Sequence, residues 1–255
     1  MTAVHRVDDG VVRTLTLNRA DRLNALGLED RVELLDALNA SVADDQVRVL
    51  VLTGTGRVFC AGGDVRSMSQ AGPETERRLA VVGDLARVLA RCPKPVVTAV
   101  PGGAFGMGLA LVAASDVVVT TPDASFSASF AQIGLGPDCG LSWSLPLRVG
   151  RGRARTLVLT GERIGADEAQ RIGLVDRVVE PDRLHTTARD VAEQLATGAP
   201  LALARIKQIF NQDAQDLESL VEAETRSQAE LLASSDFAEG RAALLDRRAP
   251  QFTGV

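Results

Sequence analysis

Apolar positions in the first half of the chain alternate between the spacing of strands and the spacing of helices. Val11–Asn18 alternates two sets of side chains, whereas Val47–Thr53 and Val96–Val100 are short runs of mostly apolar residues. A period of two indicates a half-buried strand, and a short apolar run indicates a strand buried on both faces. These three segments are predicted to be strands, and Asp116–Thr120 is predicted to be a fourth.

Segments with helical spacing lie between these predicted strands. Leu28–Val42 carries apolar side chains three or four residues apart, and so does Arg77–Arg91, which is followed by Pro93 and Pro95. Proline ends a helix because it lacks the backbone N–H that a helix interior uses. After the third strand, a glycine-rich turn leads into the apolar segment Leu109–Ala114. This alternation predicts helices packed over largely parallel strands.

The second half of the chain has helical spacing almost throughout. Gly150, Gly161, Gly198 and Pro200 separate its segments. The predicted helices are Leu141–Val149, Arg153–Thr160, Ala166–Arg171, Arg183–Thr197, Leu201–Asn211, Leu217–Ser234 and Phe237–Arg247. We therefore predict an α/β core followed by a helical C-terminal region. The charged stretch Gln70–Arg78 in the first half is expected to be mobile.

Composition excludes several classes of protein. The 255 residues fit one large domain, or one domain with a smaller appendage. A net charge of −5, with arginines scattered among acidic residues, argues against nucleic-acid binding. The three cysteines are far apart, and no His, Cys and carboxylate cluster has the spacing of metal ligands. Without a signal peptide or a membrane-spanning run, a cytoplasmic protein that does not enter membranes is expected.

Two turns between a predicted strand and a following helix are unusually rich in glycine. One is the loop Cys60–Asp64, and the other is the loop Gly102–Gly108. Glycine permits a positive φ and lets a ligand approach the backbone closely, and N–H groups at a helix start have no intrahelical acceptor. Two such turns converging on one point would form an oxyanion hole. The alternatives are two tight packing turns, or a dinucleotide site, whose G-x-G-x-x-G spacing fails because Leu111 stands at its last position.

Five motifs in order resemble the crotonase superfamily of enoyl-CoA hydratases and isomerases along nearly the whole chain. They are Leu17–Arg19 with Asn24–Leu26, Phe59–Asp64, Pro93–Val97 with Gly102–Gly108, Leu159–Ile164 with the following Ala166–Asp176, and Phe237–Gly240. The resemblance implies a spiral of ββα units in residues 1–195 and an α-helical trimerisation region in residues 196–255. It further implies an acyl-CoA substrate, a homotrimer or a dimer of trimers, and no metal or separate cofactor, since coenzyme A enters as part of the substrate.

The resemblance also assigns residues to the site. The N–H groups of Gly63 and Met107 correspond to the two oxyanion donors. Coenzyme A is expected along Arg22, Asn24, Leu26, Ala61, Asp64 and Val65, and the pocket walls are expected to include Met68, Phe105, Phe130 and Trp143. Arg247 or Arg248 falls where the family has a basic residue that reaches the coenzyme phosphates, and its alternative is a solvated helix end.

The residues that carry proton chemistry differ from those of hydratases. Hydratases of this family use two glutamates, and the matching positions are Ala110 and Phe130, which cannot move a proton. The segment Ile133–Gly140 instead resembles a loop of the family's isomerases in which an aspartate, here Asp138, is the acid, base or nucleophile. Partial burial would raise the pKa of Asp138 toward neutral pH. The alternative is that Asp138 only caps the helix that follows it.

These features favour an enoyl-CoA isomerase that shifts a double bond, in phenylacetate-type or fatty-acid breakdown. Gly63 and Met107 would stabilise an enolate while Asp138 moves the proton. One alternative is an enoyl-CoA hydratase, for which Glu74 and Glu76 are the nearby carboxylates. The other is a crotonase homologue that binds acyl-CoA without catalysis.

Overall fold

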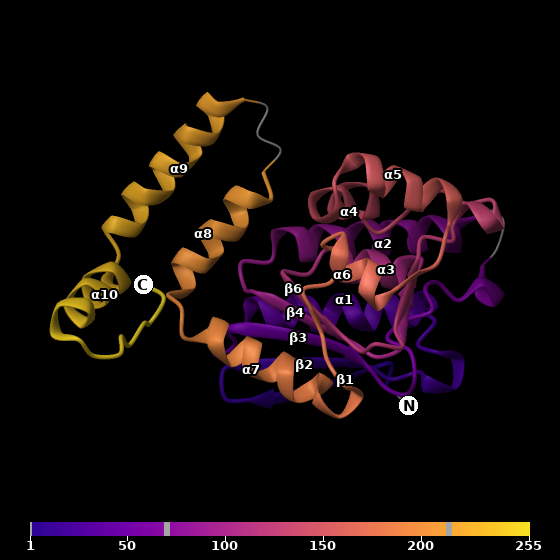
Figure 1. The fold of residues 1–255 in the computed structure, drawn as a ribbon, viewed down its shortest axis with the longest axis horizontal. Coiled ribbons are helices and arrows are strands. Elements are labelled where there is room, and N and C mark those ends of the chain that lie inside the picture. The colour runs from indigo at the N-terminus through magenta and orange to yellow at the C-terminus, as the bar shows by residue number, and fades with distance from the viewer. Residues whose placement is uncertain (1, 69–71, 213–215) are drawn as a thin grey trace.

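The computed structural model describes residues 2–68, 72–212 and 216–255, and a six-stranded sheet forms its centre (Figure 1). The strand order is β1-β2-β3-β4-β6-β9. The strands are β1 (Val4–Asp9), β2 (Val12–Leu17), β3 (Val49–Gly54), β4 (Val96–Val100), β6 (Val117–Thr120) and β9 (Arg177–Val178). Only β1 and β2 pair antiparallel in this sheet, so the prediction of largely parallel strands is confirmed.

The sheet is covered on both faces. Along β3, Leu50 and Leu52 join the larger core with α1 (Leu28–Ala43), α2 (Pro73–Arg91) and α3 (Met107–Ala113), whereas Val49 and Val51 join a second core with α7 (Leu184–Ala196). Successive side chains of a strand point to opposite faces, so a strand between two helical layers must be apolar throughout. This explains why Val47–Thr53 has no polar alternation.

A second, small sheet contains β5 (Gly103–Phe105), β7 (Ser125–Ser127) and β8 (Ile164–Gly165). Its strands have two or three residues, too few to show a period, so the sequence pattern did not predict them. Strand β5 follows directly on β4 and precedes α3. The small sheet therefore holds the second glycine loop between the main sheet and α3.

The remaining helices follow in the second half of the chain. They are α4 (Leu141–Val149), α5 (Arg151–Thr160), α6 (Ala166–Arg171), α8 (Pro200–Phe210), α9 (Leu217–Leu232) and α10 (Ser235–Asp246), with short 3-10 turns at Ala20–Arg22, Val65–Ser67, Ala131–Ile133 and Pro181–Arg183. Helices α8 to α10 lie to one side of the core (Figure 1), and Lys207 of α8 is paired with Asp116 of the core. No helix within the described ranges is long and apolar enough to cross a membrane.

Two sequence-based expectations differ from the structure. Strand β1 was not predicted, although it pairs along its whole length with β2. Helix α2 begins at Pro73 rather than at Arg77, with Pro73 in its first turn, where proline is tolerated. Pro73–Arg78, part of the stretch expected to be mobile, is therefore helical, and Gln70 lies outside the described residues.

Candidate active site

The two glycine loops lie against each other. The N–H of Phe105 donates to the carbonyl oxygen of Cys60 at 2.9 Å, and Cys60 forms a parallel bridge with Ala104 of β5. A Cβ placed on Gly62 would stand 2.8 Å from the carbonyl oxygen of Phe105 and 3.6 Å from the nitrogen of Met107. The sequence prediction that the loops meet is supported by these contacts.

Glycine is required at this junction for two reasons. Gly62 has a φ of 100°, which L side chains rarely adopt. At position 108, a Cβ would stand only 2.5 Å from the carbonyl oxygen of Cys60, so any residue other than glycine would clash with that oxygen. A side chain at either position would push the loops apart, so the glycine content is what lets the two backbones touch.

Each loop includes a backbone N–H of interest that has no acceptor among the described residues. In the first loop, Leu26 donates to the carbonyl of Gly62 and Asp64 donates to that of Leu26, which leaves the N–H of Gly63 between them unused. In the second loop, Met107 is the first residue of α3, so its N–H has no intrahelical acceptor. An oxyanion hole needs two such donors on neighbouring loops, so the free N–H groups of Gly63 and Met107 are the candidates for it.

Asp138 lies in the loop before α4 and does not cap that helix. The N-cap residue is Gly140, and no side chain caps the helix start. One carboxylate oxygen of Asp138, Oδ1, is buried and has no hydrogen-bond partner in the described part of the chain. The capping alternative is therefore wrong. No hydrogen bond through Oδ1 to the described residues explains why this carboxylate is buried.

Burial raises the pKa of Asp138 above its ordinary value of 3.8, and the positive charge of Arg31 lowers it in part. Arg31 lies on α1 and approaches the first loop, because a Cβ on Gly63 would stand 2.5 Å from Nη2 of Arg31. The Asp138 segment and the first glycine loop therefore share one neighbour. The raised pKa is the direction expected for a carboxylate that exchanges protons near neutral pH.

Arg31 was missed by the sequence analysis, although its position carried a signal. Arg31, Leu34 and Leu38 stand at i, i+3 and i+7 of α1, so they share one face, and all three are buried. A charged residue on the apolar face of a helix needs a partner or a function. The helical spacing was recognised, but the charge within its buried face was not singled out.

The positions matching the two hydratase glutamates hold apolar side chains at the second loop. Ala110 is fully buried in α3. Phe130 is buried, and its ring lies 3.8 Å from where a Cβ of Gly106 would stand. The ring forms a wall beside the second loop and offers no group that could activate water.

The residues expected along coenzyme A surround the first loop in different ways. Arg22 forms ion pairs with Asp64 and with Asp30, each at 3.4 Å. The Asn24 side chain is buried and donates to the carbonyl oxygens of Thr55 and Val58, so it holds the loop. Leu26 is buried against Gly63 through a backbone bridge, Ala61 is half-buried, and Val65 is exposed.

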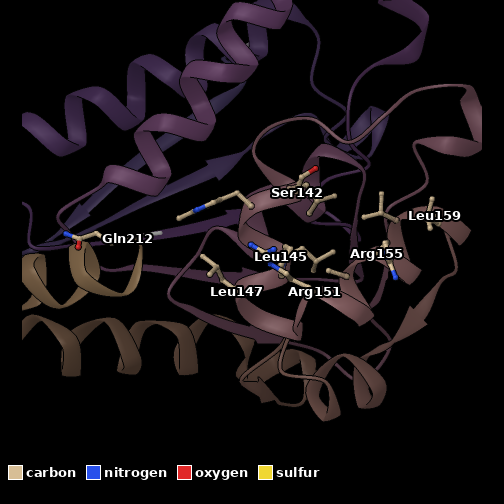
Figure 2. Close-up of a pocket in the computed structure, with 12 residues that line it drawn as sticks. Ser142, Leu145, Leu147, Arg151, Arg155, Leu159 and Gln212 are labelled. Carbon is tan, nitrogen blue, oxygen red and sulfur yellow. The ribbon is translucent and has the colours of Figure 1, made fainter. Parts of the chain in front are cut away.

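The other expected residues contribute side chains outside the first loop. The guanidinium carbon of Arg163 lies 5.1 Å from the centre of the Phe105 ring. Trp143 lines a cavity of about 480 Å³ between α4 and α5, and Gln212 also lines it (Figure 2). Arg248 is paired with Glu239 within its own helical region, and Arg247 ends α10.

Neither metal nor thiol chemistry is supported by the described residues. No group of three or more His, Cys, Asp or Glu side chains in ranges 2–68, 72–212 and 216–255 is placed to hold a metal ion. Burial raises the pKa of the Cys60 and Cys139 thiols to about 12, which keeps them protonated and poorly nucleophilic at neutral pH. The backbone N–H groups of Gly63 and Met107 and the carboxylate of Asp138 are therefore the candidate catalytic groups.

The chain is similar to known proteins over nearly its whole length. Residues 8–255 match the family described as Enoyl-CoA hydratase/isomerase. The chain is 40% identical to a 1,2-epoxyphenylacetyl-CoA isomerase of Escherichia coli (strain K12), covering 97% of each chain, and 38% identical to a probable enoyl-CoA hydratase of Rhodobacter capsulatus, covering 99% of this chain and 98% of the relative. A crystal structure of an enoyl-CoA hydratase from Bacillus anthracis superposes with a TM-score of 0.93 at 30% identity, covering 99% of this chain and 100% of that one.

Proposed function

The chain belongs to the enoyl-CoA hydratase/isomerase family, and from that premise we propose that it is an enoyl-CoA isomerase. It shifts a double bond within the acyl group of a coenzyme A thioester. The observation that carries this proposal is the buried carboxylate oxygen of Asp138, which has no partner among the described residues, together with Ala110 and Phe130 at the two positions where hydratases have glutamates. A single carboxylate suffices for a double-bond shift, because no water has to be activated.

The mechanism begins at the thioester carbonyl. Its oxygen accepts hydrogen bonds from the N–H groups of Gly63 and Met107, which stabilise the negative charge of an enolate more than the neutral carbonyl. Asp138 removes a proton from the carbon next to the carbonyl of a 3-enoyl thioester. The dienolate then takes the same proton back at its far end, which yields the conjugated 2-enoyl thioester and restores the carboxylate.

Three activities are separated by one set of assays on the purified chain. With 3-enoyl-CoA, we expect 2-enoyl-CoA to form. The reaction is monitored through the ultraviolet absorbance of the conjugated thioester. With 2-enoyl-CoA, we expect little or no 3-hydroxyacyl-CoA. Hydration as the dominant reaction would favour the hydratase, and acyl-CoA binding without any turnover would favour a silent binder.

The hydratase alternative has less support from the site. Its candidate carboxylates, Glu74 and Glu76, are exposed in the first turn of α2. A general base for water must lie within hydrogen-bond reach of that water in a protected site. The similarity to hydratases among the relatives keeps this function as the second candidate.

We also propose that the chain forms a trimer through its C-terminal helices, or a dimer of trimers. Apolar side chains on these helices are exposed in the single chain, among them Phe210 at 78% and Leu244 at 79%. Exposed apolar surface of this kind marks an interaction site. Light scattering should give a mass of three or six chains, and a monomer at micromolar concentration would contradict the proposal.

A further inference from the structure

Arg31 is a buried arginine whose charge is left largely unpaired by the described residues. Its exposed fraction is 2%, and its Nε donates to the carbonyl oxygen of Leu26 at 3.0 Å. Its two terminal nitrogens have no acceptor, and it forms no ion pair, within residues 2–68, 72–212 and 216–255. Arginine keeps its charge at physiological pH, and a buried charge is normally paired. The fold therefore does not account for most of the donors of Arg31.

A second buried arginine shows how this fold treats a guanidinium that serves structure. Arg13 is 1% exposed, and its Nε donates to Asp8 at 2.7 Å. Its Nη2 donates to Asp8 at 2.9 Å and to Asp44 at 2.6 Å. Among the described residues, two carboxylates lie within ion-pair distance of the Arg13 guanidinium and none lies within that distance of Arg31. This contrast indicates that the free end of Arg31 serves something other than folding.

The free end of Arg31 lies within the candidate active site. Nη2 stands 2.5 Å from where a Cβ of Gly63 would be, so it lies against the first oxyanion loop. Burial lowers the pKa of Arg31, and the negative charge of Asp138 partly offsets this effect, so the Asp138 carboxylate acts electrostatically on the same guanidinium. A group bound between Gly63 and Asp138 would therefore meet the terminal nitrogens of Arg31.

We propose that Arg31 is a specificity-determining residue that donates hydrogen bonds to an oxygen of the acyl group beyond the thioester carbonyl. This inference rests on the proposed function and names its substrate class, acyl-CoA thioesters that carry a keto, hydroxyl or epoxide oxygen. A hydrocarbon acyl group would cover the terminal nitrogens without offering an acceptor. Leaving a charged donor unsatisfied is more unfavourable than leaving a neutral one unsatisfied, so the preference for an oxygen should be large.

The test compares saturated thioesters, which bind without a double bond to shift. Hexanoyl-CoA and its 3-oxo, 4-oxo and 5-oxo derivatives are titrated calorimetrically into the full chain. We expect at least one oxo derivative to bind about tenfold more tightly than hexanoyl-CoA, the range of a hydrogen bond to a charged group. In Arg31→Met we expect that preference to disappear, because the oxo group loses its donor while the hydrocarbon no longer covers a charge.

Two further variants keep the test decisive. Arg189→Met removes an equal charge from an exposed ion pair on α7 and should keep the preference. Arg31→Gln keeps a neutral hydrogen-bond donor and should retain part of the preference for an oxo derivative. If circular dichroism shows that Arg31→Met is unfolded, Arg31→Gln is the variant used for the test. If the wild type bound all four thioesters equally, or if Arg31→Met lost the same affinity for all four, the inference about Arg31 would be overturned and the proposed function would stand. Failure of the folded wild type to bind any of them would overturn the proposed function as well.

Discussion

Asp138→Asn is expected to lower kcat for double-bond isomerisation by about 100- to 10,000-fold, the range over which a positioned acid or base contributes. Asparagine has nearly the same shape and cannot accept or return the proton. The measurement is the steady-state rate of conversion of 3-enoyl-CoA to 2-enoyl-CoA as a function of pH. In the wild type the rate should rise with pH through a pKa above 3.8, because Asp138 acts as a base only when ionised and burial raises its pKa.

The same substitution should not destabilise the fold. When folding raises the pKa of a carboxyl, its ionisation is harder in the folded state. The free energy of unfolding therefore falls as pH rises from the pKa of the unfolded state to that of the folded state. Asp138→Asn removes that effect, so its Tm at pH 7 should equal or exceed that of the wild type, and the gain should vanish below pH 3.8. Loss of activity with retained stability separates a chemical role from a structural one.

Asp123→Asn provides the matched control, because Asp123 is an exposed aspartate in the loop before β7. It should leave both the rate and the Tm close to the wild-type values. If Asp138→Asn isomerised 3-enoyl-CoA as fast as the wild type, Asp138 would have no part in proton transfer. A parallel loss in the Asp123 variant would point to a general effect of lost negative charge.

Met107→Pro is expected to reduce kcat by about 100- to 1000-fold relative to Met107→Ala, the typical effect of removing one oxyanion donor. Both variants lose the buried Met107 side chain, but only proline removes the N–H. The first position of a helix tolerates proline, since its N–H makes no intrahelical bond. The preceding Gly106, with φ 52° and ψ −118°, lies outside the α region that a following proline disfavours.

Met107→Ala serves as the reference for this comparison. It should lower stability by about 2–5 kcal/mol, as loss of a buried methionine side chain generally does, so both variants are assayed below their measured Tm. Similar kcat values in the two folded variants would show that the Met107 N–H does not contact the developing charge. A lower kcat in Met107→Pro with unchanged affinity for a saturated acyl-CoA would show that the N–H acts mainly on the transition state.

The main strands and the helices were predictable because their information is local. The apolar run Val47–Thr53 indicated a strand buried on both faces, and it is β3 between the α1–α3 layer and α7. The spacing of Leu141–Val149 gave the bounds of α4 without error. The glycine loops were visible for the same reason, since a positive φ and a missing Cβ are requirements of single residues such as Gly62.

The membership of the site was only partly predictable, because it depends on contacts between distant parts of the chain. Gly63, Met107 and Asp138 were named from the resemblance, and their roles in the reaction remain proposals. Trp143 was expected in the pocket wall; it lines a cavity between α4 and α5, and its contact with the acyl group stays a prediction. The short strands β5, β7 and β8 were not predicted, because pairing across the chain, and not a local period, creates them.

The sequence alone thus determined the helices, the strands β2, β3, β4 and β6, the family and the glycines that let two loops touch, because each follows from patterns of residues near one another in the chain. Only the tertiary structure decided which polar groups remain unpaired. The N–H groups of Gly63 and Met107, the Asp138 carboxylate and the end of Arg31 become distinctive once every competing partner has been placed. Hydrogen-bond satisfaction and burial are properties of the whole fold, so no local pattern can encode them.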